Sequence, residues 1–272
     1  MVLINFSQGK PRMMSYQEIL PSAPLCAYIS CFWRTKTNTI ATKDFHRVYP
    51  DGCMDIIFNF SDPLVAKECE KQSVNSSPVF LVGMMTKPIM SGSLGRIDLL
   101  GVRFKAQALS YLTTISFSDV TDKVIDLKLI NGLIAHELVD ELYEKSDEHR
   151  ILYLERYFQE KFLKTSTKIP WMQNIIHAIE ASNGNVDLEQ LSRNTGISPR
   201  QIQRTFKKNI GIGPKKFGQV VRFNALKKFL DSGEKQSFLA SAFDYGYYDH
   251  PHLTKSFKDI AGISPSEYLL NS

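Results

Sequence analysis

The strongest chemical signal in the sequence is a run of cationic side chains in its last third. Residues 193–228 contain ten lysines and arginines and no aspartate or glutamate, in a chain of 272 residues with a formal net charge of +5. A field of this kind attracts a polyanion, because each phosphate that it neutralises releases condensed counterions. The run therefore predicts a nucleic-acid partner. Its members are Arg193, Arg200, Arg204, Lys207, Lys208, Lys215, Lys216, Arg222, Lys227 and Lys228.

A second group of residues with chemical potential lies in the N-terminal half. Asp55 and Arg103 follow strand-like runs, so we expect them to form a buried pair or to line a ligand pocket. His46, Cys53 and Asp55 could be imagined as metal ligands, but no fourth ligand is evident. We therefore expect no metal and no other cofactor.

The composition excludes several classes of protein. Hydrophobic residues make up 43% and charged residues 22%, as in soluble globular proteins. No apolar run is long enough to span a membrane, and the N-terminus lacks the pattern of a secretory signal. The four cysteines form no C-x-x-C pair, so we expect reduced thiols in a cytoplasmic protein. No Ser/His/Asp set, phosphate loop or paired carboxylate motif indicates an enzyme.

The elements that must position these residues fall into two parts. Runs within 25–60 and 78–104 alternate like strands, and the polar stretch 61–77 is expected to be a loop. Helical spacing takes over within 105–163, and 164–168 is the best linker before Pro170. We therefore expect an α+β protein. Residues 1–165 would form a β-rich part with helices, and 170–272 an all-α domain.

An internal repeat organises the C-terminal part. RTFKKNIGIGPKKF at 204–217 matches KSFKDIAGISPSEY at 255–268 with an offset of 51 residues. Upstream the offset is 50, so that Leu188 matches Phe238 and Ser192 matches Ala242. Each repeat reads as a helix, a turn with glycine and a second helix, which predicts two helix-turn-helix units.

The second helix of each unit is the expected reading helix. Near 198–208, Ser198 is the predicted cap, and Ile202, Phe206 and Ile210 share one inward face. Near 249–258, Asp249 is the predicted cap, and Leu253 and Phe257 point inward. The outward side chains are expected to contact DNA. They are Arg200, Gln203, Arg204, Lys207 and Lys208 in the first unit, and His250, His252, Thr254 and Lys255 in the second.

One amphipathic helix over 215–230 is expected to join the two units. Its sixteen residues would span roughly 24 Å at about 1.5 Å per residue. A rigid spacer of that order suits two reading helices in successive major grooves, which lie about 34 Å apart.

This arrangement resembles the DNA-binding domain of the AraC/XylS family of bacterial transcription regulators. The resemblance covers about 170–270. It rests on the S-x-x-x-I-x-R-x-F-K segment at 198–207, on the Gly-Ile-Gly-Pro segment at 211–214 that ends this helix, on Arg222 and Ala225, and on FKDIAGISPSEYL at the end. It implies base contacts from Arg200, Gln203 and Arg204, and from His250, His252 and Lys255. The chain departs from the family pattern at Ser241, Pro251 and Leu253.

The N-terminal half is similar to a domain of some AraC-type regulators that carries a Y-P-D-G-x-x-D motif. That motif runs here from Tyr49 to Phe58, and Gly101-Val102-Arg103-Phe104 strengthens the match. This resemblance implies that residues 1–165 form a small barrel-like sensing or dimerisation domain with helices. The C-terminal resemblance implies a double-stranded DNA partner. It leaves open whether the protein binds a small-molecule effector, forms a homodimer or contacts RNA polymerase. It gives no reason to expect a membrane partner.

Three alternatives stay open at this point. The chain could join DNA binding to cysteine chemistry, as Ada-type proteins do, although its cysteine spacing fits that pattern poorly. It could be a non-specific nucleoid or RNA-binding protein, although the basic run lacks aromatic stacking platforms. The apolar stripe from Ile130 to Leu142 is most simply part of the core, and the alternative is that it forms a dimer interface.

Overall fold

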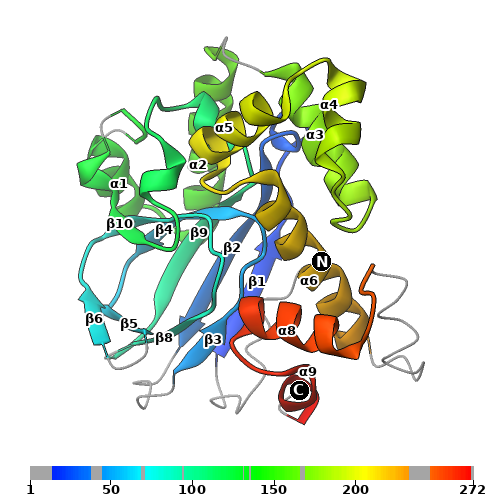
Figure 1. The fold of residues 1–272 in the computed structure, drawn as a ribbon. Helices are drawn as coiled ribbons and strands as arrows, with labels where there is room; N and C mark the ends of the chain where they lie inside the picture. Colours follow the sequence, from blue (N-terminus) through cyan, green and yellow to red (C-terminus); the bar gives the residue numbers. More distant parts are fainter. Residues whose placement is uncertain are drawn as a thin grey trace.

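Figure 1 shows the fold in a computed structural model, with two β-sheets of the N-terminal half beside a C-terminal set of helices. The structure describes residues 14–37, 45–68, 71–93, 95–130, 132–134, 136–165, 169–232 and 246–270. Within these ranges, no helix has the length and apolar character that crossing a membrane requires. The predicted α+β class, β-rich first and helical afterwards, is confirmed.

Ten strands among the described residues form two antiparallel sheets. One has the strand order β1-β2-β9-β4-β7-β10 and the other β3-β8-β5-β6, so the barrel-like part consists of two open sheets. The strands are β1 Met14–Ile19, β2 Ile29–Thr37, β3 His46–Val48, β4 Met54–Asn59, β5 Leu64–Glu68, β6 Lys71–Asn75, β7 Val79–Val82, β8 Ile89–Ser93, β9 Asp98–Phe104 and β10 Val124–Asp126.

The six-stranded sheet is buried on both faces, which explains its nearly continuous apolar strands. Side chains such as Phe32 and Ile56 belong to the large core shared with the helices. Trp33 and Ile57, one position further along each strand, belong to a separate apolar cluster on the opposite face. The other buried members of that cluster are Cys31, Phe80, Ile97 and Leu99.

The structure corrects two expectations from the sequence. Residues 61–77, expected to be a loop, contain the β5–β6 hairpin at the edge of the four-stranded sheet. Its composition is polar, with Val65 as a buried apolar anchor, so the usual strand signal is weak. After Phe104, short 3-10 turns and β10 precede the first α-helix at His136, where we expected helices throughout. Ile130 and Leu133 are buried there without lying in a helix.

The α-helices follow in chain order. They are α1 His136–Tyr143, α2 Asp147–Leu163, α3 Pro170–Ala181, α4 Leu188–Thr195, α5 Pro199–Ile210, α6 Pro214–Asp231, α8 His250–Ala261 and α9 Pro265–Leu270. The 3-10 helices are η1 Ala23–Leu25, η2 Ala108–Tyr111, η3 Phe117–Asp119 and η4 Leu127–Leu129. Ile130, Leu133, Leu138 and Leu142 are buried, so this stripe is core. Positions Phe238, Ser241 and Ala242 of the predicted repeat lie outside the described residues.

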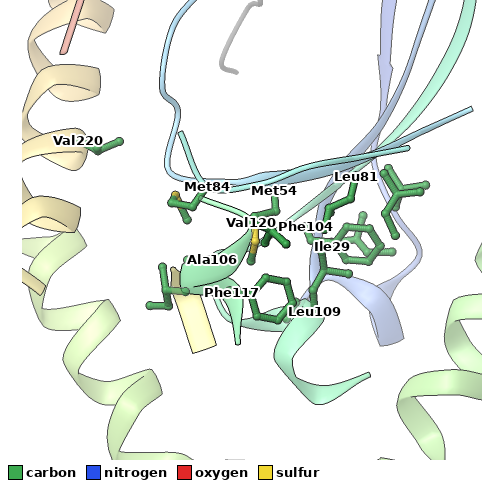
Figure 2. Packing of buried hydrophobic residues seen from close by; sticks show 14 of the residues in the cluster. Ile29, Met54, Leu81, Met84, Phe104, Ala106, Leu109, Phe117, Val120 and Val220 are labelled. Carbon is green, nitrogen blue, oxygen red and sulfur yellow. The ribbon is translucent and has the colours of Figure 1, made fainter. Parts of the chain in front are cut away.

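The helical part packs directly on the core of the six-stranded sheet. Figure 2 shows Met84, Val120 and Phe117 beneath the sheet, with Val220 on a neighbouring helix. Hydrogen bonds between described residues join the two parts. Thr121 Oγ1 donates to Gly211 O at 2.9 Å, Asn224 Nδ2 to Pro50 O at 3.0 Å, and Arg47 Nη1 to Ala261 O at 3.0 Å. Both helix-turn-helix units and the helix between them are thus attached to the β-rich part.

Candidate nucleic-acid interface and effector pocket

Helix α5, the predicted reading helix of the first unit, begins and ends at local capping signals. Ser198 Oγ accepts the Gln201 N–H, and Pro199 occupies the first turn, where its missing N–H is not needed. Gly211 ends the helix in the left-handed conformation, with φ of 99°. Gly196, with φ of 69°, forms the turn between α4 and α5. The caps and the turn predicted from the sequence are confirmed.

The buried face of α5 determines which side chains remain for a partner. Ile202, Phe206 and Ile210 are completely buried. Because α5 commits this face to the core, the opposite face is turned to solvent. The exposed side chains there are Arg200, Arg204, Lys207 and Lys208.

Gln203 differs from the other predicted contacts of α5. It is half-buried, and a Cβ added at Gly213 would lie 2.4 Å from its Nε2 atom. Its amide therefore lies against the backbone at the start of α6. A contact between Gln203 and DNA stays a prediction.

Helix α8 repeats this plan in the second unit. Asp249 Oδ1 accepts the His252 N–H at 2.7 Å, which confirms the predicted cap. Leu253 and Phe257 are completely buried, as expected. His250 and Lys255 are exposed, whereas His252 and Thr254 are half-buried.

His252 is engaged by its own protein on two sides. Its Nδ1 accepts the Tyr248 N–H at 3.4 Å, and its ring lies 5.7 Å from Tyr247 and 5.5 Å from Tyr248. Thr254 Oγ1 lies 3.4 Å from His250 Nδ1. The turn before α8 therefore fixes the His252 ring, which the sequence did not reveal.

A cavity of about 320 Å³ lies between the two sheets, within the size range of small-molecule sites. Most of its walls are apolar, with Ile57, Leu64 and Phe80 among the residues that line it. Asn224 and Lys227 of helix α6 also line the cavity. A molecule bound there would therefore touch both the β-rich part and the helix that joins the two units.

Asp55 and Arg103, the predicted pocket residues, form a pair at the wall of this cavity. Arg103 donates from Nε and Nη2 to the two oxygens of Asp55, each at 3.2 Å. Its Nε also lies 3.2 Å from Asp51 Oδ2. Burial raises the pKa of the Asp55 carboxyl, and the attraction of Arg103 offsets part of that rise. Asp55 and Arg103 thus form a buried pair and also line the cavity.

Trp33 forms part of the cavity wall through a close approach that only glycine allows. The strand register places Trp33 opposite Gly101. A Cβ at Gly101 would lie 2.0 Å from Cε2 of the indole, so the ring lies over the bare backbone of β9. This gives a physical reason for the glycine in the Gly101-Val102-Arg103-Phe104 segment.

Cys31 and Cys53 do not have the environment of reactive cysteines. Burial raises the pKa of Cys31 to about 12 and raises that of Cys53 well above its ordinary value. Both therefore stay protonated at neutral pH, and the protonated form is a poor nucleophile. Cys69 lies outside the described residues. Within the described part, no three His, Cys, Asp or Glu side chains group as a metal site would require.

Comparison with known proteins divides the chain in a similar way. Residues 17–126 match a domain of unknown function, DUF6597, and residues 191–271 match a helix-turn-helix domain family. An uncharacterized HTH-type transcriptional regulator of Haemophilus influenzae is 30% identical over 148 residues, which cover 54% of this chain and 45% of that protein. The regulator GbdR of Pseudomonas aeruginosa is 26% identical over 102 residues, which cover 37% of this chain and 28% of that protein.

These matches agree with the resemblance to AraC/XylS transcription regulators. The fold agrees, since ToxT of Vibrio cholerae superposes with a TM-score of 0.50 at 14% identity, over 96% of this chain and 99% of that one. The match covers less than half of the Haemophilus and Pseudomonas relatives. The helix-turn-helix match at 191–271 includes both α5 and α8.

Proposed function

We propose that the chain is a sequence-specific DNA-binding regulator of transcription, which reads duplex DNA with α5 and α8. The observation that carries this proposal is the division of α5 into two faces. Ile202 and Phe206 are completely buried, while Arg200 and Arg204, each two positions before one of them, are exposed. Arginine is well suited to this task, because its planar fork can bind the O6 and N7 atoms of guanine together.

Phosphate contacts are proposed for the remaining lysines of the first unit. Lys207 and Lys208 are exposed in the last turn of α5. Their flexible ammonium groups suit phosphate oxygens, which position a protein on DNA without reading its sequence. In the second unit we propose contacts from His250, His252, Thr254 and Lys255, with Gln203 completing the first.

Helix α6 supports the simultaneous use of both reading helices. Its 18 residues span roughly 27 Å at about 1.5 Å per residue, somewhat more than the sequence indicated. The centres of successive major grooves on one face lie about 34 Å apart. Because α5 precedes α6 and α8 packs against it, we propose that one molecule contacts two successive grooves.

We further propose that the cavity between the sheets binds a small, largely apolar effector. Its apolar walls and its enclosed polar pair are typical of ligand sites. Because Asn224 and Lys227 belong to α6, an occupant would contact the DNA-binding part directly. The family resemblance extends the proposal to residues 1–165 and 170–272 as separate domains, a homodimer, a contact with RNA polymerase and action in the cytoplasm. We propose binding rather than catalysis as its function.

The test of DNA reading uses a duplex recovered by selection from random sequences with the full chain. Arg204→Ala should weaken binding to that duplex by about 1–3 kcal/mol and relax the preference at one base position. Lys207→Ala should weaken binding to all duplexes and lower the slope of log affinity against log salt by about one. Fluorescence anisotropy over a salt series measures both effects. An unchanged base preference in Arg204→Ala would contradict the assignment of α5 as a reading helix.

A further inference from the structure

Arg222, near the middle of α6, hydrogen-bonds to two turns that are far apart in the sequence. Its Nη2 donates to Gly184 O at 3.2 Å, and its Nη1 donates to Gly246 O at 3.1 Å. Gly184 follows the end of α3, which packs beneath the first unit, and Gly246 belongs to the turn before α8 in the second unit. One guanidinium thus joins both units to the helix between them.

The guanidinium is held on its other sides as well. It lies 5.5 Å from the centre of the Tyr247 ring, within cation–π range. Its Nε is buried and has no hydrogen-bond partner among the described residues. Tyr247 is itself buried, and its ring lies 5.7 Å from His252. A continuous series of contacts therefore leads from Arg222 to a side chain of the second reading helix.

The backbone on both sides is adapted to this contact. Gly184 has a φ of 81°, and a Cβ there would lie 2.0 Å from Gly218 O and 2.8 Å from Arg222 N. The turn after α3 therefore rests on the backbone of α6. Gly246 has a φ of 76°, which directs its carbonyl in a turn that other residues rarely form.

Arginine is the side chain that such a bridge requires. Both acceptors are neutral carbonyl oxygens, so the contact depends on where the donors point rather than on opposite charges. The fork of a guanidinium presents several N–H groups in fixed directions, whereas a lysine ammonium is a compact group on a flexible stem. Lysine could reach either carbonyl but would not hold both.

We propose that Arg222 is a positioning residue that sets the distance between the two half-sites this protein accepts on DNA. The proposal rests on the proposed function, since it presumes that α5 and α8 read the same duplex. A shift of one base pair moves a half-site by about 3.4 Å and rotates it around the duplex. With both turns held to α6, the reading helices do not follow such a shift, and one spacing is strongly preferred. Without Arg222, each unit can tilt on α6.

The test compares the spacings that the full-length protein selects from random duplex DNA. For the unmodified chain we expect two half-sites at a single spacing, with affinity falling about ten-fold when one base pair is inserted or removed between them. For Arg222→Met we expect the same half-site sequences at several spacings, with the penalty for one base pair reduced to about three-fold. The same single spacing in Arg222→Met would overturn the proposal. So would loss of both half-sites from a folded variant.

Two further variants separate spacing from stability. Arg150→Met is the matched control, because Arg150 also donates to two carbonyl oxygens, Leu142 O and Tyr143 O, and lies over the Phe60 ring. It should lower the melting temperature without changing the spacing. Arg222→Lys keeps the charge and serves if the methionine variant does not fold; it should broaden the spacing, and a spacing identical to that of the unmodified chain overturns the proposal. If the unmodified chain selects no paired half-sites, the proposed function itself fails.

Discussion

At the scale of single residues, the buried ion pair between the two sheets is the costliest feature to disturb. Arg103 is only 4% exposed and lies between Asp51 and Asp55. Removing one partner from such a group leaves uncompensated charge in a site that water reaches poorly. The same residues line the cavity, so a stable pocket depends on their pairing.

Arg103→Met should lower the free energy of unfolding at pH 7 by about 3–5 kcal/mol. The deficit should shrink as the pH falls. Burial already raises the pKa of Asp55, and loss of Arg103 raises it further. The folded variant then binds a proton at a higher pH than the unfolded chain does, so acid restores stability until the unfolded carboxyl is also protonated.

Urea unfolding at pH 7.5, 6.5 and 5.5 measures this dependence. Arg96→Met is the control, because Arg96 is exposed and should change stability by less than about 0.5 kcal/mol. A deficit for Arg103→Met that stays constant over the series would show that lost packing, rather than unpaired charge, causes it.

At Gly101 the prediction concerns space rather than charge. Gly101→Ala should destabilise the protein by about 1–3 kcal/mol, because the new Cβ overlaps the Trp33 indole and forces it off the sheet. Gly132 is the contrast, since a Cβ there meets nothing within 4 Å and only its φ of 80° opposes alanine. Chemical denaturation, with tryptophan fluorescence as a second readout, compares them. Equal losses would argue against the close approach.

At the scale of elements, local signals predicted the C-terminal helices well. Ser198, Asp249 and the glycines that end the helices act within a few residues of their own position, so the sequence displays them directly. The β5–β6 hairpin escaped prediction because its stability comes from pairing with β8 across distant residues. The sequence pattern of 61–77 does not indicate which strand this hairpin pairs with.

The candidate site likewise contains some residues that the sequence could identify and others that it could not. The exposed face of α5 follows from the spacing of its buried residues, so Arg200 and Arg204 could be identified from the sequence. The contribution of Asn224 and Lys227 to the cavity depends on how α6 docks against the sheets. Both residues look like ordinary positions of an amphipathic helix, and only the tertiary contact gives them a role.

Ser198→Ala tests the element that carries the proposed function. Losing the cap of α5 should cost about 1 kcal/mol, because the Gln201 N–H loses its acceptor. Hydrogen exchange should become faster in the first turn of α5 before it changes elsewhere. Ser266→Ala, at an exposed position of α9, is the matched control and should leave both measurements unchanged. Equal exchange in the two variants would mean that Ser198 does not stabilise the helix start.

At the scale of the whole molecule, the two parts share an extensive packed contact. Tyr49 of the β-rich part packs against Phe223 at 5.9 Å and Tyr268 at 5.7 Å, and so touches the linking helix and the last helix. The hydrogen bonds from Arg47, Thr121 and Asn224 also join the two parts. We therefore expect the two parts to unfold together.

Tyr49→Ala should uncouple them. Losing a partly buried ring that contacts two others should cost about 2 kcal/mol and convert a single calorimetric transition into two. Tyr248→Ala removes a ring that is 83% exposed and should keep the single transition. A single transition in Tyr49→Ala, merely shifted to lower temperature, would place the coupling in other contacts.

The central claim is that α5 and α8 read one duplex together, and hydroxyl-radical footprinting of the full chain on its selected duplex tests it most directly. The account predicts two protected patches on one face of the DNA, about 10–10.5 base pairs apart from centre to centre. It further predicts that Arg204→Ala weakens one patch and Lys255→Ala the other. A single patch, or uniform protection that does not depend on sequence, would contradict the claim.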